Sequence, residues 1–243
     1  MDHLQYCNEK SAAAGCFWPY IKLYIAEDQR MALNILLAFL RELQEVAERQ
    51  LEPEIARLRL HWWRNEIEKN RETPSQHPIL QAVAAQRLER TITPENLIRM
   101  IRAAESELDL SVIKDEERLI AHAIESSGTV FEMFAAICGG NKLAQHAARR
   151  LGAADYLLNE LEYKQHLLNF TVDNTYRFTL ANKLVAECFS SLRENTQPLQ
   201  PALWVAAKLL AARAEHPSFD PRNSPIKANW IAWRAARQAT RKQ

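Results

Sequence analysis

The sequence predicts an all-α protein, and three observations support this prediction. Helix-favouring residues dominate the composition, above all Ala, Leu, Glu, Arg and Gln. Glycine is scarce, at 5 of 243 residues, and no glycine-punctuated run of alternating Val, Ile and Thr indicates a β-strand. Apolar residues instead recur at intervals of three and four, which is the spacing of one helix face. We therefore expect helices along the whole chain.

The first predicted helix covers residues 28–51, with Asp28 as its N-cap. Its inward face carries apolar residues at helical spacing: Met31, Ile35, Leu36, Leu40 and Leu43. Pro53 suits the first turn of a second helix, because the amide that proline lacks has no partner there, and this helix extends to about Asn70. The two prolines of RETPSQHP then indicate a loop. Further helices are expected at 79–88, 94–108, 115–138, 141–169, 174–194, 200–214 and 225–240.

The organisation of the chain favours one domain. A chain of 243 residues can bury a substantial core without disulfides or metal ions. No linker-like tract divides it, and it contains no internal repeat or low-complexity segment. We predict a single domain over residues 1–243, built as a helical bundle.

The charge balance argues against a nucleic-acid partner. The chain has 31 basic and 30 acidic residues, for a formal net charge of +1, so it has no global field that would attract a polyanion. Acids also accompany the basic residues along nearly every predicted helix. The sequence contains no Ser-His-Asp set, glycine-rich phosphate loop or HExxH motif, so hydrolase and nucleotide-binding functions have no support.

Cysteine spacing and hydropathy predict the compartment. Cys7, Cys16, Cys138 and Cys188 form no CxxC motif, which favours reduced thiols over a disulfide framework or a zinc site. We find no signal-peptide pattern and no run of about eighteen apolar residues. We expect a cytoplasmic protein that makes, at most, peripheral contact with the inner membrane.

Several sequence blocks resemble one known family. AARRLGAADYLLNELEYKQHL, from Ala147 to Leu167, is similar to the pattern G-x-A-x-Q-L-T-N-I-L-R-D-x-x-x-D of squalene and phytoene synthases. Upstream, the chain has an A-F-x-R-E block at Ala38 to Glu42, RLHWWRNEIEK at 59–69, His77-Pro78, and SSGTVFEMFAAICGG at 126–140, in the family's order. The resemblance spans residues 6–167 and implies the isoprenoid synthase fold, an all-α single-domain bundle.

The resemblance also indicates which positions would hold the metal-binding aspartates in an active family member. In this family two aspartate pairs, each one helical turn apart, hold magnesium ions that bind and activate an allylic diphosphate. Here the first pair of positions holds Gln44 and Glu48, and the second holds Tyr163 and Leu167. Magnesium requires oxygen ligands, preferably carboxylates, which tyrosine and leucine cannot supply. We assign no catalytic residue and no metal or other cofactor, and only Glu45 and Glu48 remain as weak candidate magnesium ligands.

Other residues are expected to line the former catalytic face. These candidates for a substrate or ligand pocket are Arg41, Glu45, Tyr156, Asn159 and Glu160. Tyr156 and Tyr163 either fill the space that substrate and metals occupy in the family or line a remodelled apolar pocket. Alternatively, Glu45 and Glu48 pair with Arg41 and Arg49 as ordinary ion pairs on the helix surface.

A polar stripe follows on the same segment as the second motif. Asp155, Asn159, Glu162 and His166 recur at +4, +7 and +11. We interpret them as a solvated helix face, with a displaced metal site as the alternative.

The last predicted helix has features of an interaction surface. Ile226, Trp230 and Trp233 share one side, and Arg234 and Arg237 precede the further cations Arg241 and Lys242. Tryptophan combined with cations is typical of helices at a membrane surface or a partner interface. The alternative is that the cations only complement the negative end of the helix dipole.

These observations favour a non-catalytic member of the family that binds a protein partner, an isoprenoid lipid, or both, at a membrane surface. One branch of the family acts in respiratory complex I assembly and departs from the aspartate pattern, so the resemblance implies a role of that class. The alternative is an active prenyltransferase that condenses two prenyl diphosphates head to head with magnesium.

Overall fold

The computed structural model describes residues 2–48, 52–70, 72–108, 113–164, 168, 170–194 and 201–240, except for the side chains of residues 47 and 48. Helices account for the regular structure in this part of the chain, so the all-α prediction is confirmed. The α-helices are α1 (His3–Ser11), α2 (Trp18–Ile21), α3 (Glu27–Glu48), α4 (Pro53–Lys69), α5 (Pro78–Ala85), α6 (Pro94–Glu107), α7 (Glu116–Ala123), α8 (Thr129–Ile137), α9 (Lys142–Asp155), α10 (Asn174–Glu194), α11 (Pro201–Glu215) and α12 (Pro225–Thr240).

Three shorter elements complete the list. A 3₁₀ turn, η1 (Lys22–Tyr24), follows α2. Two π-helical segments, η2 (Ile124–Gly128) and η3 (Tyr156–Glu160), continue α7 and α9 respectively. Ile113 and Leu168 also form an isolated parallel bridge.

Three of the sequence predictions need correction. Asp28 is not the N-cap of α3, because this helix begins at Glu27 and Asp28 lies in its first turn. The predicted helix at 141–169 ends in the structure at Glu160, where residues 161–163 form a turn. α1 was not predicted, because its mean polarity is high and only Cys7 and Ser11 are buried. The Asp2 carboxylate caps α1 by accepting a hydrogen bond from the Leu4 amide at 3.3 Å, as an N-cap side chain does.

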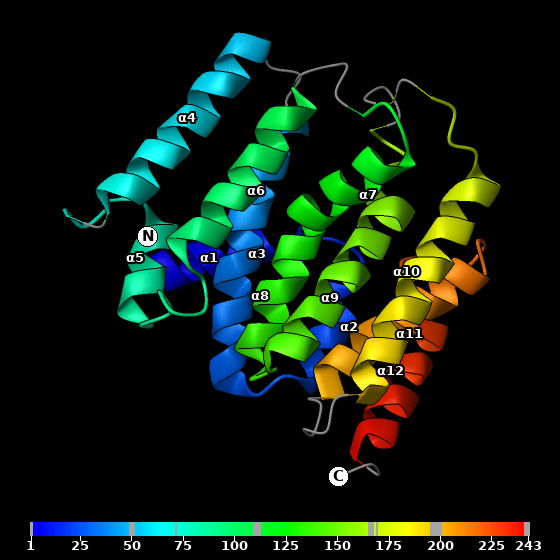
Figure 1. Ribbon diagram of the computed structural model, residues 1–243. Helices are drawn as coiled ribbons and strands as arrows, with labels where there is room; N and C mark the ends of the chain where they lie inside the picture. Colours follow the sequence, from blue (N-terminus) through cyan, green and yellow to red (C-terminus); the bar gives the residue numbers. More distant parts are fainter. Residues whose placement is uncertain are drawn as a thin grey trace.

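The long helices lie side by side in Figure 1, with α4 at one edge of the bundle and α12 near the opposite edge. α3 packs against α1, α6 and α8, while α9 packs against α8 and α10. α11 lies between α10 and α12. A continuous apolar core runs from α1 to α12 and so joins both sides of the bundle.

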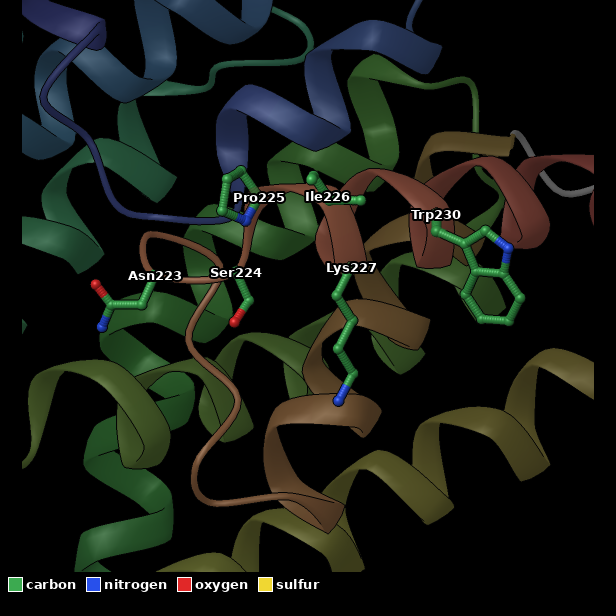
Figure 2. Close-up of a pocket in the computed structure, with 6 residues that line it drawn as sticks. All are labelled: Asn223, Ser224, Pro225, Ile226, Lys227 and Trp230. Atoms are coloured by element: carbon green, nitrogen blue, oxygen red, sulfur yellow. The ribbon is translucent and has the colours of Figure 1, made fainter.

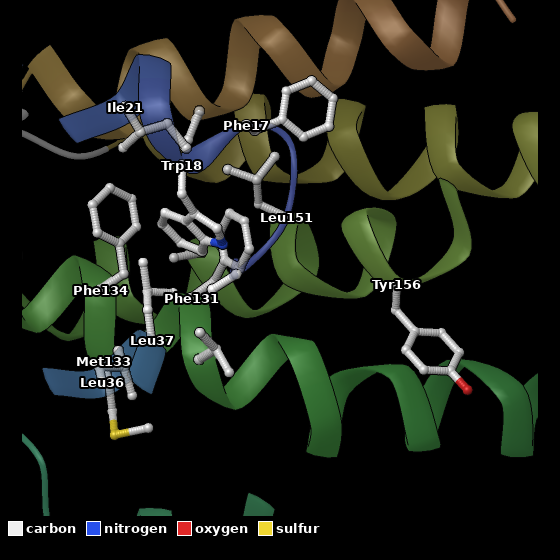
Figure 3. Packing of buried hydrophobic residues seen from close by; sticks show 14 of the residues in the cluster. Phe17, Trp18, Ile21, Leu36, Leu37, Phe131, Met133, Phe134, Leu151 and Tyr156 are labelled. Atoms are coloured by element: carbon white, nitrogen blue, oxygen red, sulfur yellow. The ribbon is translucent and has the colours of Figure 1, made fainter. Parts of the chain in front are cut away.

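Aromatic rings anchor the N-terminal segment to the core. Trp18 of α2 packs against Phe131 and Phe134 of α8, with ring centroids 5.0 and 5.4 Å apart (Figure 3). Trp63 of α4 meets Phe39 of α3 edge to face at 5.0 Å. Trp63 is buried, whereas the adjacent Trp62 is exposed, as their different directions on a helix require.

Two glycines permit a close helix crossing. A Cβ atom on Gly152 of α9 would lie 2.3 Å from the carbonyl oxygen of Ser127 in η2. A Cβ atom on Gly128 would lie 2.8 Å from the carbonyl oxygen of Arg149. The backbones of α9 and η2 therefore touch, and this contact fixes the position of the segment that continues into η3. Among the described residues, no helix is both long enough and apolar enough to cross a bilayer.

Candidate functional site

The first motif lies in the second half of α3, where α1 covers it. The Lys10 ammonium lies 2.8 Å from Glu42 Oε1 and 2.9 Å from Glu45 Oε2. The Tyr6 hydroxyl also donates a hydrogen bond to Glu42. Burial alone would lower the pKa of Lys10, but its hydrogen bonds to Glu42 and Glu45 raise this pKa above its ordinary value. A lysine thus bridges the two carboxylates on this part of α3.

The motif positions themselves offer little to a metal. Gln44 is a half-buried neutral amide, and Glu48 ends α3 with a side chain outside the described residues. The Arg41 Nε atom is 3.4 Å from Glu45 Oε1, so the alternative prediction of an ion pair between these two residues is confirmed. Arg49, the partner proposed for Glu48, is also outside the described part of the chain.

A second lysine-bridged cluster lies beside η3. The Lys164 ammonium is 2.8 Å from Glu107 Oε1 of α6 and 2.9 Å from Glu160 Oε2 of η3. It also lies 5.2 Å from the centre of the Tyr156 ring. The Glu107 side chain is only 9% exposed, so this charge is almost wholly withdrawn from water. A buried carboxylate of this kind is stable only when it is paired and hydrogen-bonded.

Neighbouring polar groups complete the cluster. His122 Nε2 of α7 lies 3.1 Å from Glu107 Oε1, and its Nδ1 lies 3.2 Å from the Ser106 hydroxyl. The Ser127 hydroxyl donates a 2.7 Å hydrogen bond to Glu160 Oε1.

The pKa shifts follow from this arrangement. Burial by itself raises the pKa of Glu107, but the Lys164 charge and the contact with His122 bring it below its usual value. Burial works in the opposite sense on Lys164, and there the charges of Glu160 and Glu107 prevail and raise the pKa. Both partners are therefore held in their ionised forms.

Tyr156 occupies the space next to this cluster. It is fully buried, and its ring meets the His122 ring at 5.2 Å in a T-shaped contact. Figure 3 shows its hydroxyl directed away from the Trp18 and Phe131 rings. Within the described part of the chain this hydroxyl has no hydrogen-bond partner.

Asn159 faces the N-terminal segment. Its amide donates a 2.7 Å hydrogen bond to Asp155 Oδ1, and the Cys16 thiol lies 3.9 Å from its Oδ1. Burial, followed by the charge of Glu160, raises the pKa of Asp155 to about 7, despite the hydrogen bond from Asn159. The interpretation of this stripe as a solvated face is therefore wrong for Asp155, although Glu162 is exposed. His166 lies outside the described residues.

Tyr163 does not line the interior, so that prediction is wrong. Its side chain is 71% exposed, because the helix ends at Glu160 and the following turn directs Tyr163 outward. Leu167, the other position of the second motif, lies outside the described residues. Of the five predicted pocket residues, the structure places Tyr156 and Glu160 in the Lys164 cluster, Asn159 on Asp155, and Arg41 and Glu45 together on α3.

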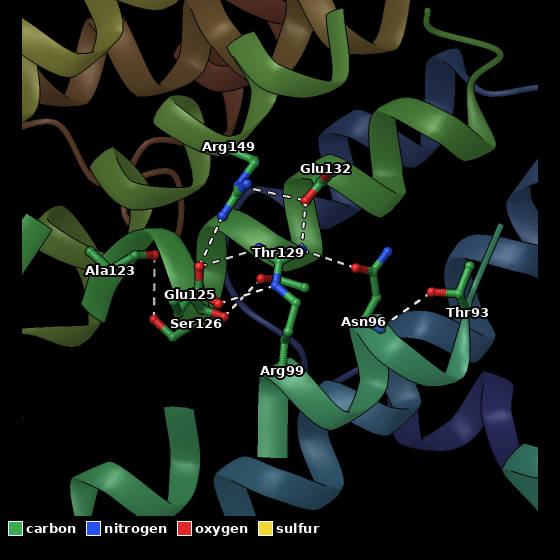
Figure 4. Close-up of polar contacts among 9 residues, drawn as sticks. All are labelled: Thr93, Asn96, Arg99, Ala123, Glu125, Ser126, Thr129, Glu132 and Arg149. Atoms are coloured by element: carbon green, nitrogen blue, oxygen red, sulfur yellow. Dashed lines mark hydrogen bonds and ion pairs between the residues drawn. The ribbon is translucent and has the colours of Figure 1, made fainter. Parts of the chain in front are cut away.

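A network of arginines and glutamates ties the surrounding helices together (Figure 4). Arg99 of α6 contacts Glu125 and Glu132, each at 3.1 Å. Arg149 of α9 contacts the same two carboxylates at 3.0 and 3.6 Å. The two positive and two negative charges balance, and they link α6, η2, α8 and α9.

The carboxylates that the structure describes near the two motifs do not fit a magnesium cluster. Glu42 and Glu45 are bridged by Lys10, and Glu107 and Glu160 are bridged by Lys164. A divalent ion would have to displace an ammonium group at either place, and magnesium also demands near-octahedral oxygen ligands. The described residues contain no group of three or more His, Cys, Asp or Glu side chains arranged to hold a metal ion.

The last helix places its predicted surface residues together. Trp230 and Trp233 are 54% and 48% exposed, and the guanidinium groups of Arg234 and Arg237 lie 5.2 and 4.8 Å from the respective ring centres. Arg241 and Lys242 lie outside the described residues.

The bundle has the all-α isoprenoid synthase fold. It is similar to the crystal structure of a dehydrosqualene synthase in complex with a ligand, with a TM-score of 0.72 and 15% sequence identity, over 99% of this chain and 96% of that one. It is also similar to squalene synthase HpnC from Alicyclobacillus acidocaldarius, with a TM-score of 0.68 and 14% identity, over 98% and 94% of the two chains.

The family follows from the sequence. The family model of squalene/phytoene synthase matches residues 19–161, which is more than half of the chain. The chain therefore belongs to the squalene/phytoene synthase family, as its motifs indicated. No curated protein sequence matches it.

Several residues of the two charged clusters were not among the predicted site residues: Lys10, Glu42, Glu107, His122 and Lys164. One signal was available, because Glu160 and Lys164 are four residues apart, a spacing that favours an ion pair on a helix. The other contacts join residues that are 15 to 57 positions apart in the chain, for which no local pattern exists.

Proposed function

We propose that this protein is a non-catalytic member of the squalene/phytoene synthase family that binds a protein or an isoprenoid lipid at a membrane surface. The observation that carries the proposal is the Lys164 ammonium between Glu107 and Glu160. In this proposal, the ammonium provides these two carboxylates with positive charge from within the chain, as divalent ions do for the aspartates of an active family member.

The physical argument concerns the leaving group. Departure of a diphosphate from an allylic carbon requires that its developing charge be neutralised, and divalent ions held by carboxylates do this efficiently. A lysine that is already hydrogen-bonded to two carboxylates has little charge left for a phosphate. The buried Tyr156 ring adjoins the same ammonium, so a substrate would also have to displace a side chain.

The alternative function is head-to-head condensation of two prenyl diphosphates, which membership of the family favours. The test is pyrophosphate release from purified protein incubated with magnesium and farnesyl or geranylgeranyl diphosphate. We expect release no greater than from the matched Glu45→Ala/Glu48→Ala double variant. Release clearly above that control would establish catalysis and end the non-catalytic proposal.

The binding role needs a separate test. Tagged protein would be purified from detergent-solubilised membranes of its own host, and the bound material would be analysed for proteins and extracted lipids. We expect a membrane complex or an isoprenoid lipid to copurify, and assembly intermediates of respiratory complex I would match the complex I branch of the family. Recovery of neither would contradict the binding role.

A further inference from the structure

Two helices expose apolar stripes that the bundle leaves uncovered. On α12, Ile226, Trp230 and Trp233 are 86%, 54% and 48% exposed. On α4, Ile55, Leu58 and Trp62 are 45%, 67% and 46% exposed. Isolated apolar residues on a surface are ordinary, but three large ones on a single helix face mark a contact surface.

The stripe on α12 lies opposite the face that packs into the bundle. The buried residues of α12 are all alanines and lie on the side that packs mainly against α11: Ala228, Ala232, Ala235, Ala236 and Ala239. Ile226, Trp230 and Trp233 recur at four and three residues and fall on the other side of the helix. The buried contacts of α12 with the bundle therefore come from the alanine face and not from the outward tryptophans.

Charge distinguishes the two stripes. α4 mixes acids with its cations, including Glu54, Glu66 and Glu68. In α12 the charged side chains are all basic, namely Lys227, Arg234 and Arg237. This acid-free helix belongs to a chain whose formal net charge is only +1, so its positive charge is local.

The basic side chains lie against aromatic rings of this region. Arg234 and Arg237 stack on Trp230 and Trp233, and the Lys227 ammonium lies 5.1 Å from the centre of the Phe219 ring. A surface depression of about 520 Å³ opens at the start of the stripe, beside Pro225, Ile226 and Trp230 (Figure 2). Apolar side chains, flanking cations and a shallow recess thus share one surface.

We propose that α12 docks on a membrane rich in acidic phospholipid, with Ile226, Trp230 and Trp233 entering the interface and Arg234 and Arg237 contacting lipid phosphates. Tryptophan is favoured at the boundary between headgroups and acyl chains, and basic residues are attracted to an anionic leaflet. This inference specifies the membrane part of the proposed function, on which it rests.

The test is cosedimentation of the full chain with vesicles. Vesicles of phosphatidylcholine alone would be compared with vesicles that contain about 30% phosphatidylglycerol, a lipid of the anionic class that attracts basic segments. We expect binding to the acidic vesicles only, and weaker binding as salt concentration rises, because salt screens the attraction.

Two double variants on α12 identify the surface. Arg234→Gln/Arg237→Gln should weaken binding roughly 30-fold, from the usual contribution of two basic residues near an anionic membrane. Trp230→Ala/Trp233→Ala should weaken it by at least about tenfold through lost apolar burial. The matched control is Leu58→Ala/Trp62→Ala on α4, which removes side chains of similar exposure and should bind like the wild type. Circular dichroism and thermal melting would confirm that each variant is folded.

Several outcomes would overturn the inference: no binding of the wild type to acidic vesicles, equal binding to neutral ones, or loss of binding in the α4 control instead. A wild-type dimer that dissociates in the Trp230→Ala/Trp233→Ala variant would assign this surface to a second copy of the chain. Pyrophosphate release by the wild type would contradict the non-catalytic proposal alone, because vesicle binding does not depend on catalysis.

Discussion

Lys164 is the residue on which the proposed non-catalytic role rests most directly. Its ammonium lies 2.8 Å from Glu107 and 2.9 Å from Glu160, so the two carboxylates share one positive charge. His122 provides the buried Glu107 carboxylate with a further polar partner. Buried ion pairs contribute modestly as a whole but become costly when one partner is removed, because the other charge is stranded. The cluster should therefore be sensitive to single substitutions.

Lys164→Met should lower the free energy of unfolding by about 3–5 kcal/mol, because it leaves Glu107 buried without its cation. Urea denaturation followed by circular dichroism measures the change. Lys183→Met on α10 is the control, because Lys183 is exposed and its loss should cost less than about 0.5 kcal/mol. Equal, small effects of the two substitutions would show that Lys164 is not the internal counter-ion.

The raised pKa of Asp155 should make the stability of the protein depend on pH. Its pKa is raised to about 7 from an ordinary value of 3.8, so the folded protein keeps a proton that the unfolded chain has released. Stability from this group is fully present below about pH 4 and is lost as pH rises towards 7. Asp155→Asn keeps the oxygen that accepts from Asn159 and removes this dependence.

The urea midpoint, measured at pH 5 and pH 8, checks the Asp155 prediction. The wild type should lose more stability between these two values than Asp155→Asn does, because only the wild type must ionise a buried carboxyl group. An identical loss in both proteins would mean that Asp155 titrates normally in the folded state.

At the scale of elements, the contact between α9 and η2 positions the site. Gly152 lets the α9 backbone touch the Ser127 carbonyl, and Ser127 in turn donates its hydroxyl to Glu160. The same crossing is braced by Arg149, which pairs with Glu125 and Glu132. This close approach therefore places η3 against the charged cluster.

Gly152→Ala should destabilise the protein by about 2–3 kcal/mol, because the new methyl group meets backbone that cannot move aside. Gly139→Ala provides a contrast, since Gly139 has open space but a φ of +74°, and should cost about 1 kcal/mol. Thermal and urea denaturation of both variants measure the difference. A Gly152→Ala cost no larger than that of Gly139→Ala would contradict the close crossing.

Element boundaries were predictable where capping and periodicity agree. Pro53 opens α4 as the sequence indicates, and Pro78 and Pro94 likewise stand first in α5 and α6. The Thr93 hydroxyl caps α6 and lies 3.2 Å from the Asn96 amide nitrogen. The end of η3 was not predictable, because Leu161 and Tyr163 continue a helical pattern in sequence. A tertiary contact, the bridge between Ile113 and Leu168, follows that turn and has no local signal.

At the scale of the whole molecule, the family and the fold were readable from ordered motifs, whereas the site was readable only in part. The losses at Gln44 and Tyr163 were visible directly in the sequence. The nearby ion pairs were not, because Lys10 belongs to a helix without an apolar stripe and Glu107 pairs with residues from other helices. Motif comparison shows where this sequence departs from the family pattern, and only packing shows which side chains lie around those positions.

The two lysine bridges have a consequence for how this bundle depends on its surroundings. The occupancy of a site by an ion from solution depends on the concentration of that ion. A lysine ammonium is part of the chain, so it is present in every molecule. We therefore expect the structure around Lys10 and Lys164 not to depend on the concentration of divalent ions. A charge balance that needs no added ion is compatible with the proposed binding role.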